Sequence, residues 1–401
     1  MKAANRWTML ILGMSAQAAG SAFMYGIPFL VPDLRSALGL DLAEVGLIVS
    51  APSVGMVLTL VAWGAAADRW GERLVMSIGL GIAGVFAVLA ATTTSLLPLG
   101  LVLVVAGAAA SSVVSASGRV VLGWFPPERR GIAMAWRQTA HPLGVTIAGF
   151  MLPPVAAAWG IGAAFLSLGG LCLVATLLVV LFVVDPPRHQ VQGAVSVNPY
   201  RRPILYRIHT SAALHVVGQF TVAAFGPVYL VYRGWSPAAA GAVFAIAGFA
   251  GAATRLAAGR WSDAIGDRLS PVKWLALANG AALLATAVFL PTSVGAVLVI
   301  IASIMNVSTN GLTFTAAAEI AGQSWAGRTL GVHTTAQNAI GAVAGPVMGS
   351  VIAARGFGVG FAVAAVFPVM AAVAVWTRRR PSVPVEGRTS GTLVGSSGGF
   401  A

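Results

Sequence analysis

The sequence predicts an all-α integral membrane protein in which twelve transmembrane helices form two pseudo-symmetric six-helix bundles. Hydrophobic residues make up 58% of the 401 residues and charged residues only 9%, against about 25% charged residues in soluble proteins. Long charge-free runs recur along the chain, and a helix of about 20 residues spans a bilayer core of about 30 Å. A short charged pattern also occurs twice, 195 residues apart. Most of the chain is therefore expected to lie in lipid.

The first half of the chain contains four charge-free runs that supply six helices. They cover residues 7–32, 45–67, 74–118 and 138–184. The last two have 45 and 47 residues, which is too long for one helix and enough for two. Residues 92–95 interrupt one of them and residues 159–160 interrupt the other. The first run is longer than a signal-peptide core of roughly 7–15 residues, so we take it as an uncleaved helix.

The second half supplies six more helices. Its charge-free runs cover residues 208–232, 234–254, 274–318, 329–354 and 356–377. The run of 45 residues is interrupted at 291–293 and counts as two helices. We expect an N-terminal bundle over residues 1–185, a cytoplasmic central loop over 186–203, a C-terminal bundle over 204–380, and a disordered cytoplasmic tail over 381–401 that is rich in Gly, Ser and Thr.

The basic residues are distributed unevenly between the predicted loops. If the N-terminus is cytoplasmic, the cytoplasmic segments hold 18 Lys and Arg residues and the outside loops hold three, Arg35, Arg233 and Arg355. Because positively charged loops stay inside, we expect a multi-pass protein of the cell (plasma) membrane with both termini in the cytoplasm.

The overall charge and the cysteine content exclude several other classes of protein. The net charge of +13 comes from basic residues that sit singly or in short clusters, whereas a nucleic-acid site gathers them on one face. The one cysteine, Cys172, provides neither a disulfide framework nor a multi-cysteine metal site. We expect no nucleic-acid partner, no metal and no cofactor, and a monomer whose partners are the lipid bilayer and a small-molecule solute.

The charged pattern G-x3-D-x2-G-x-R follows the second helix of each predicted bundle. Its two copies contain Gly64, Asp68, Arg69, Gly71 and Arg73, and then Gly259, Asp263, Gly266 and Arg268. A duplicated membrane bundle is typical of a transporter. A membrane-embedded enzyme would need paired acids at the membrane surface, and Asp68 and Asp263 are the only repeated ones, so we expect no enzyme.

Residues 64–73 resemble the signature loop of the major facilitator superfamily, and residues 259–268 resemble its weaker repeat. Arg119-x3-Gly123 resembles part of a second motif of that family. The resemblance extends over essentially the whole chain in span number, symmetry and loop position. It implies the fold of that family and a secondary transporter that works by alternating access. It also implies that the residues of both copies form a gating latch between the two halves, although for the second copy a charged stop signal for topology is an equal alternative.

In that family, spans one, four, seven and ten line the central cavity. Each corresponding span here carries polar residues four apart, which share one helix face. The substrate-binding candidates are Gln17, Tyr25, Ser115, Arg119, His215, Gln219, Asn306 and Asn310. The alternative roles are helix packing for Ser115, interhelical hydrogen bonding for Asn306 and Asn310, an interface position for Tyr25, and extension to the membrane surface for Arg119, Arg137 and Arg255.

The sign of the charges within the spans indicates the class of solute. All eleven acidic residues lie in loops or at predicted helix ends, whereas arginines and histidines lie inside spans. Such a cavity favours an anion, because Arg binds a carboxylate through two parallel hydrogen bonds. His215 and His141 are the candidates for proton coupling, and whether Arg137 and His141 face the cavity stays open. We therefore expect a proton-coupled transporter of a small organic anion, a carboxylate. The alternative is a proton-driven efflux pump for drugs or metabolites with a largely apolar cavity.

Overall fold

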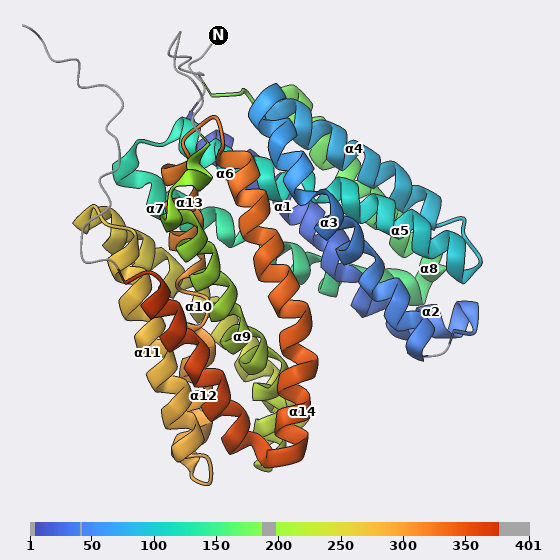
Figure 1. Cartoon of the computed structure of the whole chain (residues 1–401). Helices are drawn as coiled ribbons and strands as arrows, with labels where there is room; N and C mark the ends of the chain where they lie inside the picture. The colour runs from blue at the N-terminus through green and yellow to red at the C-terminus, as the bar shows by residue number, and fades with distance from the viewer. Residues whose placement is uncertain (1–4, 41, 187–197, 377–401) are drawn as a thin grey trace, which may run out of the picture.

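The computed structural model describes residues 5–40, 42–186 and 198–376 and is helical almost throughout (Figure 1). The predicted tail over residues 381–401 and most of the predicted central loop over 186–203 lie outside the described residues. The first half of the chain forms α1 (Arg6–Gly26), η1 (Ile27–Leu30), α2 (Val31–Leu38), α3 (Leu42–Trp70), α4 (Glu72–Ala90), α5 (Leu96–Ala110), α6 (Ser112–Trp124), α7 (Pro127–Gln138) and α8 (Ala140–Phe182). The second half forms η2 (Pro199–Arg201), α9 (Pro203–Tyr232), α10 (Pro237–Ile265), α11 (Leu269–Val288), α12 (Ser293–Met305), α13 (Asn310–Ala321) and α14 (Ala326–Ala374).

Within the described part of the chain, ten helical segments are long and apolar enough to cross a membrane. Two of them are much longer than the rest, since Pro127–Phe182 has 56 residues and Ala326–Ala374 has 49. Each contains one glycine with a non-helical backbone, Gly160 and Gly356, both with φ of 81°. A side chain at this φ would be strained. Figure 1 shows α14 turning back along itself, as the sequence pattern around Gly356 predicts.

The remaining helix ends follow the sequence pattern closely but not completely. α4 ends and α5 begins on either side of the predicted break at 92–95, and α12 begins at the predicted break at 291–293. The all-helical, membrane-spanning fold class is therefore confirmed. The sequence did not predict the interruptions at Ser111, between α5 and α6, and at 306–309, between α12 and α13.

Apart from α7, which packs mainly on α10 and α13, helices α1–α8 pack mainly on one another, and so do helices α9–α14. A cluster of buried apolar side chains fills each group, from Met9 to Val183 in the first and from Val217 to Ala365 in the second. The two groups meet where α3 packs on α14 and where α7 packs on α10. A third cluster, which includes Phe314 of α13, lies between them.

Two backbone crossings bring the groups close together at one end of the molecule. A Cβ atom on Gly64 would lie 2.2 Å from the carbonyl oxygen of Gly327, and one on Gly131 would lie 2.6 Å from that of Gly259. Only glycine fits such contacts, which allow two helices to approach without a side chain between them. In Figure 1 the groups converge at this end, near α6, α7 and α13, and diverge toward α2 and the turn of α14.

Candidate functional site

Asp68, near the C-terminal end of α3, binds the N-terminal end of α14 in the other half. Its Oδ1 accepts a hydrogen bond from the backbone N–H of Gly327 (2.8 Å), and its Oδ2 accepts one from that of Arg328 (3.0 Å). The carboxylate is only 2% exposed. A carboxylate in this position satisfies N–H groups that have no partner within the helix and neutralises the positive end of the helix dipole. We define the first latch cluster as Asp68, Glu72, Arg119, Gly327 and Arg328.

Arg119 on α6 completes the first latch cluster. Its guanidinium forms an ion pair with Asp68 and a second one with Glu72 (Nε to Oε1, 2.7 Å). It also donates to the backbone carbonyl oxygen of Gln323, in the other half, at 2.6 Å. Two carboxylates thus neutralise its charge, and the side chain is 7% exposed. The sequence predicted Arg119 as a substrate-binding residue, and because of these ion pairs we propose it as a latch residue instead.

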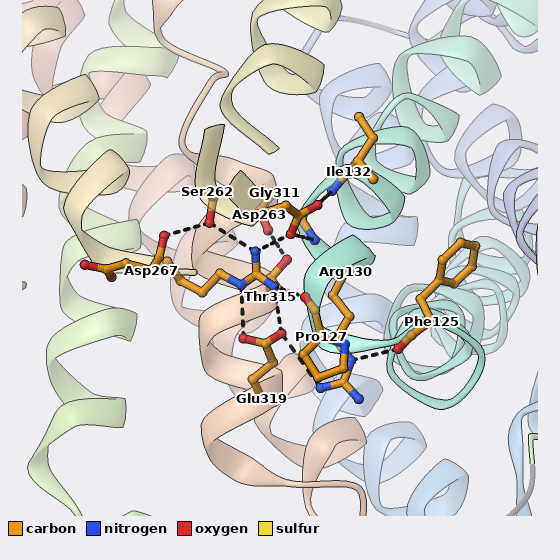
Figure 2. Close-up of polar contacts among 12 residues, drawn as sticks. Phe125, Pro127, Arg130, Ile132, Ser262, Asp263, Asp267, Gly311, Thr315 and Glu319 are labelled. Carbon is orange, nitrogen blue, oxygen red and sulfur yellow. Dashed lines mark hydrogen bonds and ion pairs between the residues drawn. The ribbon is translucent and has the colours of Figure 1, made fainter. Parts of the chain in front are cut away.

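A second cluster has the same design with the halves exchanged (Figure 2). Asp263, near the end of α10, accepts hydrogen bonds from the backbone N–H groups of Gly131 and Ile132 near the start of α7, at 2.9 Å each. Arg268 binds Asp263 and also donates to Glu319 on α13 at 3.1 Å. Both copies of the repeated pattern therefore contact the opposite half. We define the second latch cluster as Asp263, Arg268, Glu319, Arg130 and Gly131.

The basic groups of the second latch cluster also reach across the two halves. Arg268 donates to the backbone carbonyl oxygen of Pro127, and Nη1 of Arg130 lies 3.8 Å from Oε1 of Glu319. Burial alone would lower the pKa of the Arg268 guanidinium, but the hydrogen bonds and charges of Glu319 and Asp263 raise that pKa above its ordinary value. Arg268 therefore stays charged, and its ion pairs persist at every pH at which the two acids are ionised.

Sequence reasoning missed the partners of the two aspartates. Gly131 and Gly327 are 196 residues apart, which is also the separation of Gly160 and Gly356. Applying this offset along the whole chain would have found the glycine pair. The offset does not reveal the roles of Glu72 and Glu319, because each carboxylate pairs with an arginine that is distant in the sequence, Arg119 and Arg268.

The other residues predicted for the latch lie in or beside the two loops. Arg73 donates its backbone N–H to Asp185, just beyond the end of α8, at 2.8 Å. The guanidinium of Arg69 lies 5.6 Å from the ring of the tryptophan that follows it. Gly71 and Gly266, with φ of 100° and 62°, turn the chain where α3 and α10 end. These residues shape the two loops, whereas the glycine crossings and the two latch clusters join the halves.

The polar candidates of the first half are bonded inside the protein. Oε1 of Gln17 accepts a hydrogen bond from Ser117 (2.9 Å), and the same hydroxyl accepts one from Nε of Arg137 (2.9 Å). One serine therefore joins Gln17 to Arg137. Ser115 donates to the carbonyl oxygen of Leu60 (3.0 Å) and is fully buried, so we assign it to packing between α6 and α3.

In the second half, the polar candidates are bonded to one another. Nδ2 of Asn310 lies 3.4 Å from Oε1 of Gln219, and both side chains are half-buried. Asn306 accepts a hydrogen bond at Oδ1 from Asn279, and its carbonyl oxygen lies 3.1 Å from Nε2 of His215. His215 and Asn306 are 3% and 2% exposed. Gln219 and Asn310 are the more accessible members of this group.

Tyr25 on α1 and His141 at the start of α8 form a pair of rings. Their centroids are 4.6 Å apart in an edge-to-face arrangement. The Tyr25 hydroxyl lies 3.9 Å from the sulfur of Met56. Tyr25 is half-buried and His141 is exposed. His141 follows Arg137 by four residues, so it lies about one helical turn farther along the chain.

Two arginines between the halves, Arg137 on α7 and Arg255 on α10, meet at Gln138. Arg137 is 1% exposed and donates to the side-chain oxygen of Gln138 at 2.9 Å. Arg255 donates to the backbone carbonyl oxygens of Gln138 and Val307, both at 2.9 Å. No carboxylate of the described residues lies within ion-pair distance of either arginine. We define the central cationic site as Arg137, Gln138, Arg255, His141 and Tyr25.

The central cationic site lies deeper in the protein than the second latch cluster. Arg137 is six residues beyond Gly131 on α7, and Arg255 is eight residues before Asp263 on α10, which is about 9 and 12 Å along the helices. Both guanidinium groups donate to groups of the protein itself, whereas the alternative that the sequence left open was extension to the membrane surface. Arg137 is buried and Arg255 is half-buried, and a pair of cations without a compensating charge in such a setting attracts an anion.

The comparisons with known proteins agree with this architecture. The family model described as Major Facilitator Superfamily matches residues 9–344. An uncharacterized MFS-type transporter of Mycobacterium tuberculosis is 40% identical over 383 residues, which are 94% of this chain and 86% of that protein. The hexuronate transporter of Bacillus subtilis is 24% identical over 46% of this chain and 42% of its own length. The 4-hydroxybenzoate transporter PcaK of Acinetobacter baylyi is 26% identical over 45% of this chain and 39% of its own length.

A solved structure of similar fold is that of the proton:xylose symporter XylE bound to 6-bromo-6-deoxy-D-glucose. Its TM-score is 0.75 at 16% sequence identity, over 92% of this chain and 95% of that chain. At this level of identity the likeness concerns the fold alone. Together with the family model and the relative that is 40% identical, it leads to one conclusion: the chain belongs to the major facilitator superfamily of membrane transporters.

Proposed function

We propose that the protein is a secondary transporter that moves a small organic anion, a carboxylate, across the cell membrane together with protons. The central cationic site carries this proposal. Arg137 and Arg255 lack a carboxylate partner among the described residues, whereas Arg119 and Arg268 each have two. A buried cation is costly unless a negative charge compensates it. An anionic solute supplies that charge.

The surroundings of the two arginines suit a solute with a carboxylate at one end and a flat or hydroxylated body. A guanidinium binds a carboxylate through two parallel hydrogen bonds. Phe314 places an aromatic ring beside Arg137, with the guanidinium carbon 5.7 Å from the ring centroid. Gln17, Gln219 and Asn310 remain candidates for hydrogen bonds to the rest of the solute.

The names of two relatives support an anionic solute. One is called a hexuronate transporter and the other a 4-hydroxybenzoate transporter, and both solutes carry a carboxylate at neutral pH. Their similarity covers less than half of this chain, so they support the class of solute and not its identity.

We also propose a membrane arrangement for the transport cycle. Pro127–Phe182 and Ala326–Ala374 each cross the membrane twice, on either side of Gly160 and Gly356, which gives twelve crossings. The bundles over residues 1–185 and 204–380 then have both termini in the cytoplasm. In alternating access, the two latch clusters close the cytoplasmic end of a monomer, and the carboxylates of Asp68 and Asp263 leave the ends of α14 and α7 when that end opens.

Uptake into proteoliposomes tests the proposed function. The full chain is reconstituted and given 4-hydroxybenzoate, a hexuronate, xylose or a lipophilic cation. The outside is made more acidic than the inside, so that the proton gradient is directed inward. We expect accumulation of one or both carboxylates and none of xylose or the cation. Arg137→Gln and Arg255→Gln each remove a charge-assisted hydrogen bond worth about 1.5–3 kcal/mol, and so lower uptake at limiting solute by about 10- to 100-fold.

The control is Arg201→Gln, which removes an exposed guanidinium from η2 and is expected to leave uptake unchanged. Transport of the lipophilic cation without either carboxylate would contradict the proposal and favour the efflux alternative. Normal uptake by both arginine variants would remove the central cationic site from the transport pathway.

A further inference from the structure

Three hydrogen-bonded groups form a chain in the second half, outside the sites described above. The Tyr200 hydroxyl on η2 lies 3.1 Å from Nε2 of His209 on α9, and Nδ1 of His209 lies 2.9 Å from Nδ1 of His333 on α14. The two histidines are 6% and 0% exposed. Nε2 of His333 is buried and has no partner among the described residues. We call His209 and His333 the histidine pair.

The contact between two Nδ1 atoms limits the number of protons that the histidine pair can hold. One Nδ1 carries a hydrogen and the other offers its lone pair. In the neutral pair, the donor ring therefore has a bare Nε2, and the acceptor ring carries its hydrogen on Nε2. One added proton binds the bare Nε2 and leaves the Nδ1–H···Nδ1 bond intact. A second proton would have to bind the accepting Nδ1 and would break that bond, so the intact pair holds one.

Tyr200 gives the histidine pair a route toward the latch end of the protein. The residue is half-buried and lies next to Trp325, with ring centroids 6.4 Å apart, just before the start of α14. Burial raises the pKa of the Tyr200 phenol, so the phenol stays protonated near neutral pH. Its hydroxyl can donate to a bare Nε2 of His209 or accept from a protonated one by rotation.

Phe314 on α13 lies between the histidine pair and the central cationic site. Its ring meets the ring of His333 edge-on, with centroids 4.6 Å apart. The guanidinium carbon of Arg137 lies 5.7 Å from the centroid of the same phenylalanine. A proton on the pair thus adds a positive charge that only the Phe314 side chain separates from Arg137. An anion at Arg137 relieves the repulsion between the two cations.

We propose that Tyr200, His209 and His333 form the proton site of the transporter, and that one proton on the histidine pair and one anion at Arg137 strengthen each other's binding across Phe314. This inference rests on the proposed function, because it takes an anion at the central cationic site as given. Linkage requires the effect to be reciprocal, so the proton raises anion affinity by the same factor by which the anion raises proton affinity. Couplings between sites are typically about 5- to 150-fold.

The histidine pair accounts for proton binding better than the two histidines named from the sequence. His215 contacts a backbone carbonyl, that of Asn306, inside its own half, and His141 packs edge-on against the ring of Tyr25. Neither belongs to a chain that leads toward the latch end. Other ionisable groups lie near the histidine pair in the described part of the chain. They are Tyr206 beside Tyr200, Arg137 beyond Phe314, Arg328 beyond Trp325, and Asp68 of α3, which contacts the start of α14.

The first test needs no solute. Nitrogen-15 NMR of the full chain, labelled at histidine and held in lipid nanodiscs, follows the imidazole nitrogens through the range in which histidine titrates, about pH 5 to 8. We expect a coupling between two Nδ1 atoms and the uptake of one proton by the pair. Loss of the coupling in both His209→Gln and His333→Gln assigns it. Absence of the coupling in the wild type, or uptake of two protons by the pair, would overturn the proposal.

The second test separates coupling from transport. Proteoliposomes are assayed for exchange of 4-hydroxybenzoate at equal pH and for its accumulation under a pH gradient. In His209→Gln and His333→Gln we expect exchange at saturating 4-hydroxybenzoate to stay within about twofold of wild type, and accumulation to fall by at least tenfold. Tyr200→Phe is expected to slow accumulation, whereas Tyr206→Phe, which alters the exposed neighbouring phenol, is the matched control.

The outcomes of the second test are distinguishable. Accumulation by His333→Gln at the wild-type level would overturn the proton site. Loss of exchange together with accumulation in both histidine variants would do the same, because a separate proton site leaves exchange intact. Absence of 4-hydroxybenzoate transport by the wild type counts against the proposed function, and the NMR titration still decides whether the pair binds one shared proton.

Discussion

Replacing Asp68 with Asn tests whether the first latch cluster keeps the two halves together. The carboxylate accepts one backbone hydrogen bond on each oxygen, from Gly327 and from Arg328. The amide keeps one of these acceptors and replaces the other with a donor. The ion pair between Asp68 and Arg119 lies within the first half, so it is present with the latch closed or open and cancels from the comparison.

The magnitude follows from the two backbone hydrogen bonds that cross between the halves. The third crossing contact, the ion pair of Asp68 with Arg328 at 3.7 Å, involves a partly exposed guanidinium and contributes little. Hydrogen bonds to a charged group contribute about 1.5–3 kcal/mol each, and neutral ones about 0.5–1.5 kcal/mol. Exchanging two bonds of about 1.5 kcal/mol for one of about 1 kcal/mol removes about 2 kcal/mol from the closed state. Since about 1.4 kcal/mol is a factor of ten, the ratio of closed to open molecules falls by about 30-fold.

Alkylation of an introduced cysteine measures this ratio. The native Cys172 is buried and contributes a low background. Ala326, 0% exposed at the start of α14, is changed to Cys, so that N-ethylmaleimide reaches it only when the latched end opens. We expect Asp68→Asn to raise the labelling rate by about 30-fold and Asp33→Asn, on α2, to leave it unchanged. An unaltered labelling rate in Asp68→Asn would refute the claim that the Asp68 carboxylate holds the start of α14 in the closed state.

Three further substitutions probe neighbouring parts of the account. Gly64→Ala, whose Cβ would lie 2.2 Å from the Gly327 carbonyl oxygen, should raise the same labelling rate, and a wild-type rate would mean that the crossing is not close. Arg119→Gln removes the cation that pairs with both buried carboxylates of the first latch cluster, at a cost of about 3–5 kcal/mol; it should lower Tm and leave KM unchanged, and a KM effect alone would return Arg119 to the substrate site. Gly160→Ala, at φ of 81°, should lower stability by about 1–2 kcal/mol in thermal unfolding, whereas Gly170→Ala, which meets open space, should not.

The helices and their ends were predictable because lipid imposes a strong constraint on the sequence. A span must be free of unpaired charge over its full length, so runs and their interruptions mark the helices directly. The glycines at 160 and 356 were equally visible, since only glycine tolerates the backbone that reverses the chain there. The breaks at Ser111 and 306–309 were not, because they lie inside apolar runs and depend on contacts with other helices.

The roles of the buried arginines were not predictable from periodicity. A spacing of four puts Ser115 and Arg119 on one helix face, but it does not say which helix that face meets. Arg119 meets Asp68, 51 residues away, and is neutralised. Arg137 and Arg255, which the sequence left with surface alternatives, meet Gln138 instead and stay uncompensated. The packing of α6 against α3 determines the partner of Arg119, and the packing of α7 against α10 determines those of Arg137 and Arg255.

The most direct test of the central claim compares a carboxylate with its uncharged amide. Isothermal titration of the purified full chain measures the affinity for 4-hydroxybenzoate and for 4-hydroxybenzamide, in wild type, Arg137→Gln and Arg201→Gln. An anion site at Arg137 and Arg255 predicts that the acid binds at least about tenfold more tightly than the amide. This preference should disappear in Arg137→Gln and persist in Arg201→Gln. Equal binding of acid and amide by the wild type, or an undiminished preference in Arg137→Gln, would contradict the account.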